Sequence, residues 1–301
     1  MTAAMQGPYS ASVNRFQLGD FEVTSVLDGI ALPKAVKPPF CLDLTDAELE
    51  ALGTAAHVPS DRFEHPFVPT LVNTGKELVL FDVGFGTKGP TANTGLLRQR
   101  MAEAGYAPED VDLVVFSHVH PDHILGVTVD GAPAFPNARY AIGQVEFDEW
   151  TSGARIPQSR AANREMFLEL IVPLADQMTF LSPGDTVASG ITSLEAYGHS
   201  LGHMMFMVEN GGKQVLLWGD LANHYVFSLQ VPEAKVFFDD DSDQAIETRK
   251  RVLDMVATDA IPAGLAPAPG TAAHRELFKG VDVVIALHLG RRLALRDPKT
   301  G

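Results

Sequence analysis

The chain has 301 residues, of which 46% are hydrophobic and 20% are charged, so it can bury a sizeable core. Its formal net charge of −15 disfavours nucleic acids and anionic membranes as partners. Residues 1–17 lack the basic and apolar segments of a secretory signal, and no apolar run approaches the ~18 residues of a membrane span. The single cysteine, Cys41, excludes an internal disulfide and a thiolate metal cluster. We therefore expect a cytoplasmic protein that acts on a small molecule.

The N-terminal region is predicted to contain one β-like run and one long excursion. Residues 1–15 are expected to be flexible, and the β-like run covers residues 21–29. Residues 33–65 are rich in proline and carry one predicted helix over residues 43–52, capped by Asp43 or Thr45. We expect this excursion to cover the functional site or to form the contact of a homodimer. Its two histidines, His57 and His65, are expected to have surface or structural roles.

Two strands, a helix and a buried strand are expected next, and the first strand covers residues 67–73. The strand over residues 77–82 ends in Asp82, and an amphipathic helix over residues 94–104 is stopped by Gly105. The apolar run 111–116 then reads as a buried strand.

Four potential metal ligands, His118, His120, Asp122 and His123, directly follow this buried strand. In extended geometry His118 and His120 point the same way, because they are two residues apart. Pro121 then turns the chain, so that the next two side chains reach a second position nearby. Imidazole nitrogen and carboxylate oxygen are the ligands that zinc and similar ions bind in catalytic sites. A lone histidine would predict little, but four such groups in one loop predict a metal site.

After this motif the sequence predicts a strand over residues 138–142 and helices over residues 144–150 and 161–174. Trp150 and Phe167 lie on these helices. They are candidates for the wall of a substrate pocket, although aromatic residues at helical spacing are more often part of the core.

Further candidate site residues follow the strands predicted at 178–182, 191–197 and 214–218. His199 and His203 lie in a glycine-containing turn, where glycine lets the backbone bend tightly. Asp220 follows the third strand and is suited to bridging two ions, since each carboxylate oxygen can take one. His224 is a candidate for the mouth of the pocket. The acidic run 239–243 precedes a helix predicted at 244–257, and we explain it as N-capping and as a complement to the helix dipole.

The pattern His118-x-His120-x-Asp122-His123 resembles the HxHxDH signature of the metallo-β-lactamase superfamily. The motif Gly198-His199-Ser200-Leu201-Gly202-His203 and the aspartate Asp220 resemble its later motifs. The resemblance implies a single α/β domain over residues 1–301, an αββα sandwich in which two mixed sheets pack face to face with helices outside.

The resemblance also implies a ligand set. One ion would be held by His118, His120 and His199, the other by Asp122 and His123, with Asp220 as the bridge. Asp82 and His203 would hold ligand residues in place from behind. The expected cofactor is zinc, one or two ions per chain, with manganese, cobalt and iron as alternatives.

The layout is most similar to the methyl parathion hydrolase and N-acyl homoserine lactonase branch, on residues 18–24 and 105–109. This implies that a metal-activated hydroxide hydrolyses a lactone, ester or phosphotriester, with Asp122 and Asp220 as the catalytic carboxylates. A β-lactamase or a glyoxalase II-like thioesterase would use the same site plan.

The resemblance fails where a last histidine ligand is expected, because the chain has Leu265 and Ala266 there. His274 and His288 lie farther downstream, and residues 261–301 lack the closing strand of similar proteins. A second ion would therefore lose one ligand. The rival interpretation is a weakened or non-catalytic metal-binding protein.

Overall fold

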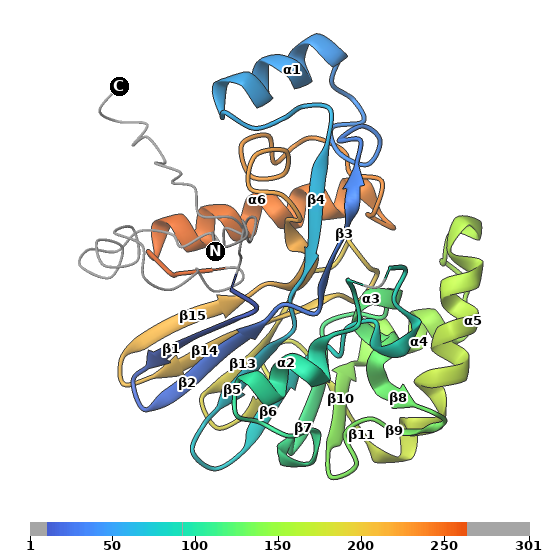
Figure 1. Cartoon of the computed structure of the whole chain (residues 1–301). Coiled ribbons are helices and arrows are strands. Elements are labelled where there is room, and N and C mark those ends of the chain that lie inside the picture. Colours follow the sequence, from blue (N-terminus) through green and yellow to red (C-terminus); the bar gives the residue numbers. More distant parts are fainter. Residues whose placement is uncertain (1–10, 92, 264–301) are drawn as a thin grey trace, which may run out of the picture.

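Two β-sheets form the centre of the computed structural model, which describes residues 11–91 and 93–263 (Figure 1). The larger sheet has seven strands in the order β1 (Val13–Leu18), β2 (Phe21–Val26), β5 (Thr70–Asn73), β6 (Leu78–Phe81), β7 (Leu113–Phe116), β10 (Arg139–Gly143) and β11 (Met178–Leu181). Strands β6, β7, β10 and β11 pair in parallel, whereas β1, β2, β5 and β6 pair antiparallel. The smaller sheet is antiparallel, in the order β12 (Thr186–Ala188), β13 (Ile191–Glu195), β14 (Met204–Asn210) and β15 (Lys213–Leu217).

The side chains of the two sheets alternate between an inner and an outer core. In β7, Leu113 and Val115 face the smaller sheet, whereas Val114 and Phe116 join the core on the outer face. In β14, Phe206 packs between the sheets. Because side chains point to opposite faces of a strand in turn, a strand covered on both faces must be apolar throughout, as the run 111–116 is.

Helices cover both outer faces, which confirms the predicted sandwich. Helices α2 (Leu97–Glu103), α4 (Gln144–Ser152) and α5 (Ala161–Leu170) lie against the larger sheet, and α6 (Ser242–Thr258) lies against the smaller one. The short helix α3 (Pro121–Ile124) contains part of the metal-ligand motif. None of the helices in the described part of the chain is both long enough and apolar enough to cross a membrane.

The predicted excursion forms a hairpin and a helix that extend from one edge of the sandwich (Figure 1). The hairpin consists of β3 (Gly29–Lys34) and β4 (Phe63–Phe67), and α1 (Asp46–Ala55) lies between them in sequence. Thr45 caps α1, because its hydroxyl accepts from Glu48 N and the Glu48 carboxylate accepts from Thr45 N. The helix was expected over 43–52, three residues too early.

Sequence reasoning missed several short strands. The strands β1, β3, β4 and β12 were not expected, nor was the small hairpin of β8 (Thr128–Val129) and β9 (Ala132–Pro133). Edge strands such as β1 and β12 bury one face only and carry polar residues on the other, so their apolar pattern is weak. The helix expected over 161–174 ends at Leu170, and a 3₁₀ turn, Val172–Gln177, follows.

After α6 the chain returns to the smaller sheet. Leu216 N donates to Pro262 O at 2.8 Å, and Ala263 forms a parallel bridge with Leu216. This places the last described residue beside β15, the strand that leads to Asp220.

Candidate metal centre

The predicted ligands all follow the ends of strands at one edge of the sandwich. Asp82 follows β6 and His118 follows β7, which pair in parallel, so both loops leave the larger sheet together. His199 follows β13, and Asp220 follows β15 of the smaller sheet. Met204 N donates to Ser117 O at 2.9 Å and joins the two sheets here.

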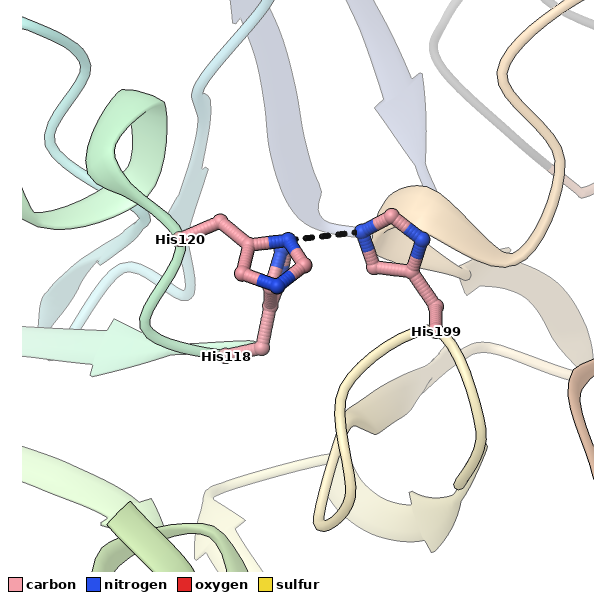
Figure 2. Close-up of side chains that lie close together, drawn as sticks. All are labelled: His118, His120 and His199. Atoms are coloured by element: carbon pink, nitrogen blue, oxygen red, sulfur yellow. Dashed lines mark hydrogen bonds between the residues drawn. The ribbon is translucent and has the colours of Figure 1, made fainter. Parts of the chain in front are cut away.

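One group of three imidazoles comes from two of these loops. Ligand nitrogens of His118, His120 and His199 lie within 4.8 Å of one another, and all three residues are buried (Figure 2). The Nδ1 of His120 lies 3.0 Å from the Nε2 of His199. These residues are the set that the resemblance assigned to the first ion.

The His118 ring has its lone pair directed into this group. The Ser117 hydroxyl donates its one proton to Asp82 at 2.8 Å, so it accepts from the Nδ1 of His118 at 3.0 Å. The Nε2 atom is then unprotonated, and it is buried with no hydrogen-bond partner among the described residues. Burial and the four neighbouring histidines hold the pKa of His118 well below its usual value, so the ring is neutral.

A second group lies beside the first. Ligand atoms of His118, His123 and Asp220 also lie within 4.8 Å of one another. One oxygen of Asp220 is 3.5 Å from the Nε2 of His123, and the other is 3.4 Å from the Nε2 of His199. Asp122 lies 3.3 Å from the same His123 nitrogen, so it flanks this group.

The second group carries opposite charges in contact. Burial lowers the pKa of His123, but Asp122, Asp82 and Asp220 outweigh it and raise this pKa well above its usual value. Burial raises the pKa of Asp220, but His123 and His199 hold it well below its usual value. The three carboxylates therefore favour positive charge at this group.

Imidazole nitrogens and carboxylate oxygens converge here, with the buried Nε2 atoms of His118 and His123 lacking hydrogen-bond partners in the described chain. This donor chemistry fits a divalent metal ion.

Asp82 holds the two loops that follow β6 and β7. It accepts from Ser117 N and from the Ser117 hydroxyl, each at 2.8 Å, and from the Nδ1 of His123 at 2.8 Å. Its backbone has a φ of 61°, which is uncommon for a residue other than glycine. Asp82 therefore orients His123 directly and His118 through Ser117.

His203 contacts the backbone of Asp220 and packs against the His118 ring. Its Nδ1 donates to Ala196 O at 3.0 Å, and its Nε2 accepts from Asp220 N at 3.3 Å. Burial lowers the pKa of His203 to about 3, which keeps this acceptor unprotonated. Gly219 allows the contact, because a Cβ there would lie 2.5 Å from His203 Nε2.

Glu146, at the start of α4, ties the two histidine loops together, and sequence reasoning missed it. Its fully buried carboxylate accepts from Val119 N at 3.0 Å, from the Ser200 hydroxyl at 2.6 Å and from Gly202 N at 2.8 Å. Burial raises the pKa of this carboxyl to about 7. Its place in an amphipathic helix gave no sign that it points inward.

The acidic run before α6 does more than cap the helix. Of its members, Asp241 is the N-cap and accepts from Gln244 N. Asp239 lies 3.1 Å from the Nδ1 of His199, and Asp240 lies 3.1 Å from the Nε2 of His120. The expectation of a purely local capping role is therefore wrong for these two residues.

The three candidates for a substrate pocket lie in packed surroundings. Trp150 and Phe167 are both fully buried in the outer core, which agrees with the core alternative. Trp150 donates to the Ser200 hydroxyl at 2.9 Å and packs against the His120 ring. His224 accepts from Val226 N at 3.0 Å, and burial lowers its pKa to about 4.

The β3–β4 hairpin brings an aromatic group toward the metal centre. The ring of His65 stacks on Phe67 with centroids 4.8 Å apart and lies 5.5 Å from Phe238. His65 is close enough to Asp122 and Asp220 to lower the pKa of both, after the larger effects of burial and His123. The sequence predicted only a surface or structural role for His65. Nothing in the sequence of the hairpin indicates that it packs near Asp122 and Asp220.

Leu265, Ala266, His274 and His288 lie outside the described residues. The expectation of a missing last ligand rests on the sequence alone.

Comparison with known proteins gives one family. A model described as the metallo-beta-lactamase superfamily matches residues 68–264, which is more than half of the chain and contains every predicted ligand. Ribonuclease Z of Streptomyces coelicolor is 28% identical over 163 residues, which are 51% of this chain and 48% of that protein. The chain therefore aligns with only about half the length of this relative.

Solved structures share the fold. The dizinc quorum-quenching lactonase AidC has a TM-score of 0.75 at 24% identity and covers 84% of this chain and 89% of its own. The hydrolase AbOPH of the β-lactamase superfamily has a TM-score of 0.78 at 24% identity. The match covers 94% of this chain and 100% of AbOPH. At this identity the likeness shows the fold alone.

The raised pKa of Glu146 predicts a specific pH dependence of stability. Because the folded state binds this proton more tightly than the unfolded state, it contributes stability at low pH that is lost as pH rises from about 4.5 to about 7. Relative to Glu146→Gln, the wild type should therefore lose free energy of unfolding over this window, by about 1.4 kcal/mol for each unit of pKa shift. Urea unfolding of both proteins in chelator, from pH 4.5 to pH 8, measures the difference. A constant difference across the window would contradict the assignment.

Proposed function

Since the chain belongs to the metallo-beta-lactamase superfamily, we propose that it is a metal-dependent hydrolase that opens a lactone carrying an apolar substituent. The position of Asp220 is the observation that carries this proposal. Its two carboxylate oxygens face nitrogens of the two ligand groups, at 3.5 Å from His123 and 3.4 Å from His199. A residue so placed can serve two neighbouring ions, which is the arrangement that hydrolysis at a two-metal site requires.

The bound ions would be zinc, with manganese, cobalt and iron as alternatives, and they supply Lewis acidity and lower the pKa of water. His118, His120 and His199 would hold one ion, and His123, Asp122 and Asp220 the other. Asp122 is a carboxylate at the flank of the site, with a pKa lowered by His123 against the effect of burial. It is therefore ionised at neutral pH, so it would take a proton from the attacking water and pass it to the alkoxide that forms when the ring opens.

The surroundings support an apolar substrate. The half-buried rings of Phe67, Phe85 and Phe238 lie with His65 on the side of Asp122 and Asp220. Such rings bind acyl or aromatic groups well. Lactonases stand among the proteins that share the fold, including an N-acyl homoserine lactone hydrolase with a TM-score of 0.58.

An RNA substrate is disfavoured although ribonuclease Z is among the relatives. Protein affinity for RNA depends on neutralising phosphates, and this chain carries a formal charge of −15. We therefore propose a small-molecule substrate. A cytoplasmic homodimer remains the expectation from the sequence, and a phosphotriester, β-lactam or thioester substrate would use the same ligand groups.

The first test is the dependence of lactone hydrolysis on the metal ligands. His118→Ala and Asp220→Ala should abolish hydrolysis of an N-acyl lactone, because His118 belongs to both groups and Asp220 belongs to the second and contacts His199 of the first. Asp82→Ala should be milder, with a loss of roughly 10–100-fold, because Asp82 acts through Ser117 and His123. Proton release on ring opening measures the rate.

The exposed Asp176, replaced by alanine, is the matched control and should retain wild-type activity. Full turnover by a chelated, metal-free sample would refute the proposed function. If phosphotriesters or β-lactams were turned over and lactones were not, the substrate assignment alone would fail.

The second test is the metal content of each chain. The first position has three imidazoles, whereas the second has one imidazole besides the shared His118 and lacks a histidine at Leu265 or Ala266. We therefore expect about one tightly held ion per chain after dialysis, and activity that rises when zinc, manganese or cobalt is added. Elemental analysis and rate assays on the same sample measure both. Two ions retained through dialysis would contradict this asymmetry.

A further inference from the structure

Two consecutive aspartates before α6 contact the outer nitrogens of two ligand rings. Asp239 Oδ1 lies 3.1 Å from His199 Nδ1, and Asp240 Oδ2 lies 3.1 Å from His120 Nε2. Both carboxylate side chains are fully buried. Asp240 N donates to His199 O at 3.0 Å, which fixes this segment to the histidine loop.

An arginine occupies the second oxygen of each aspartate. Arg249 Nη2 lies 2.9 Å from Asp239 Oδ2, and Arg160 Nε lies 2.7 Å from Asp240 Oδ1. Both guanidinium groups are themselves held by backbone carbonyls. Arg249 is fully buried and donates to Leu221 O at 2.9 Å, and Arg160 donates to Phe238 O at 2.6 Å.

These contacts select which nitrogen of each ring faces the site. A carboxylate accepts hydrogen bonds only, so Asp240 holds the proton of His120 on Nε2 and leaves Nδ1 toward His199. Asp239 likewise holds a proton on His199 Nδ1 and leaves Nε2 facing Asp220. A ligand imidazole held in this way has a fixed orientation and greater basicity.

The arginines fix the orientation of the two aspartate carboxylates. Asp240 has one oxygen at His120 and the other at Arg160, and Asp239 has one at His199 and the other at Arg249. With both oxygens held, neither carboxylate can rotate away from its ring. The two pairs come from different elements, since Arg160 lies at the start of α5 and Arg249 lies within α6.

We infer that Arg160–Asp240 and Arg249–Asp239 are positioning pairs that fix His120 and His199 for metal binding at the first position. This inference rests on the metal centre of the proposed function, and it assigns to the acidic run a role that capping of α6 does not explain. Asp241 alone does the capping, through Gln244 N at 3.1 Å. Replacing either aspartate should therefore weaken metal binding, whereas replacing the cap should only destabilise the helix.

Zinc affinity, measured by competition with a chromophoric chelator on the full-length protein, tests this inference. Asp240→Asn and Asp239→Asn should each bind zinc roughly 10–100-fold more weakly than the wild type. Asp241→Ala is the matched control from the same segment, and it should have a lower thermal midpoint and unchanged zinc affinity. The absorption spectrum of the cobalt-loaded protein should change in the Asp240 and Asp239 variants and not in the control.

A double-mutant cycle tests the part played by arginine. Arg160→Gln should weaken zinc binding, and its combination with Asp240→Asn should bind zinc no more weakly than Asp240→Asn alone, because the arginine acts through the aspartate. Additive losses would overturn that coupling.

Zinc affinities equal to the wild type in both aspartate variants, with lowered thermal midpoints only, would overturn the inference and leave the proposed function standing. Weaker zinc binding in these variants, in a protein that hydrolyses none of the esters or lactones offered, would support the inference while the proposed function failed. A wild type that binds no zinc, cobalt or manganese would overturn both.

Discussion

Burial of many ionisable groups at one edge of the sandwich is the constraint on which the site depends. A buried polar or charged group is costly unless it is paired. Here the histidine rings are held from behind by carboxylates or by a hydroxyl, as Asp82 holds His123 and Ser117 holds His118. The nitrogens left over point toward one another. The hydrogen bonds that stabilise the buried rings therefore also leave imidazole nitrogens and carboxylate oxygens facing one point. Such a group of atoms can bind a cation.

The two sheets make such pairing possible because their strands end at the same edge. One histidine loop follows β7 in the larger sheet and the other follows β13 in the smaller, and Glu146 accepts hydrogen bonds from both. The distance between His118 and His199 is thus set by packing between the sheets and by a single buried carboxylate.

The sequence was sufficient to predict the sandwich and which side chains converge at its edge, because both leave short-range patterns. Ligands two or three residues apart after an apolar run, such as His118 and His120, can be recognised locally, and so can β7 itself. Contacts between distant segments leave no such pattern. Asp240 is 120 residues from His120, and from sequence its position before a helix has a sufficient local explanation in capping. The role of Trp150 was also ambiguous, because helical spacing of aromatic residues does not distinguish a core residue from a pocket residue.

The two halves of the metal centre differ in chemistry, and Asp220 belongs to both. The first position offers three imidazoles, two of them held by carboxylates that arginines contact in turn. The second combines His123 with Asp122 and Asp220, so its donors are mainly oxygens. Imidazole favours zinc, whereas carboxylate ligands suit harder cations as well. Because Asp220 directs one oxygen to each side, an ion at either position changes the charge that the other meets. Two ions bound here would therefore differ in affinity and influence each other through one carboxylate.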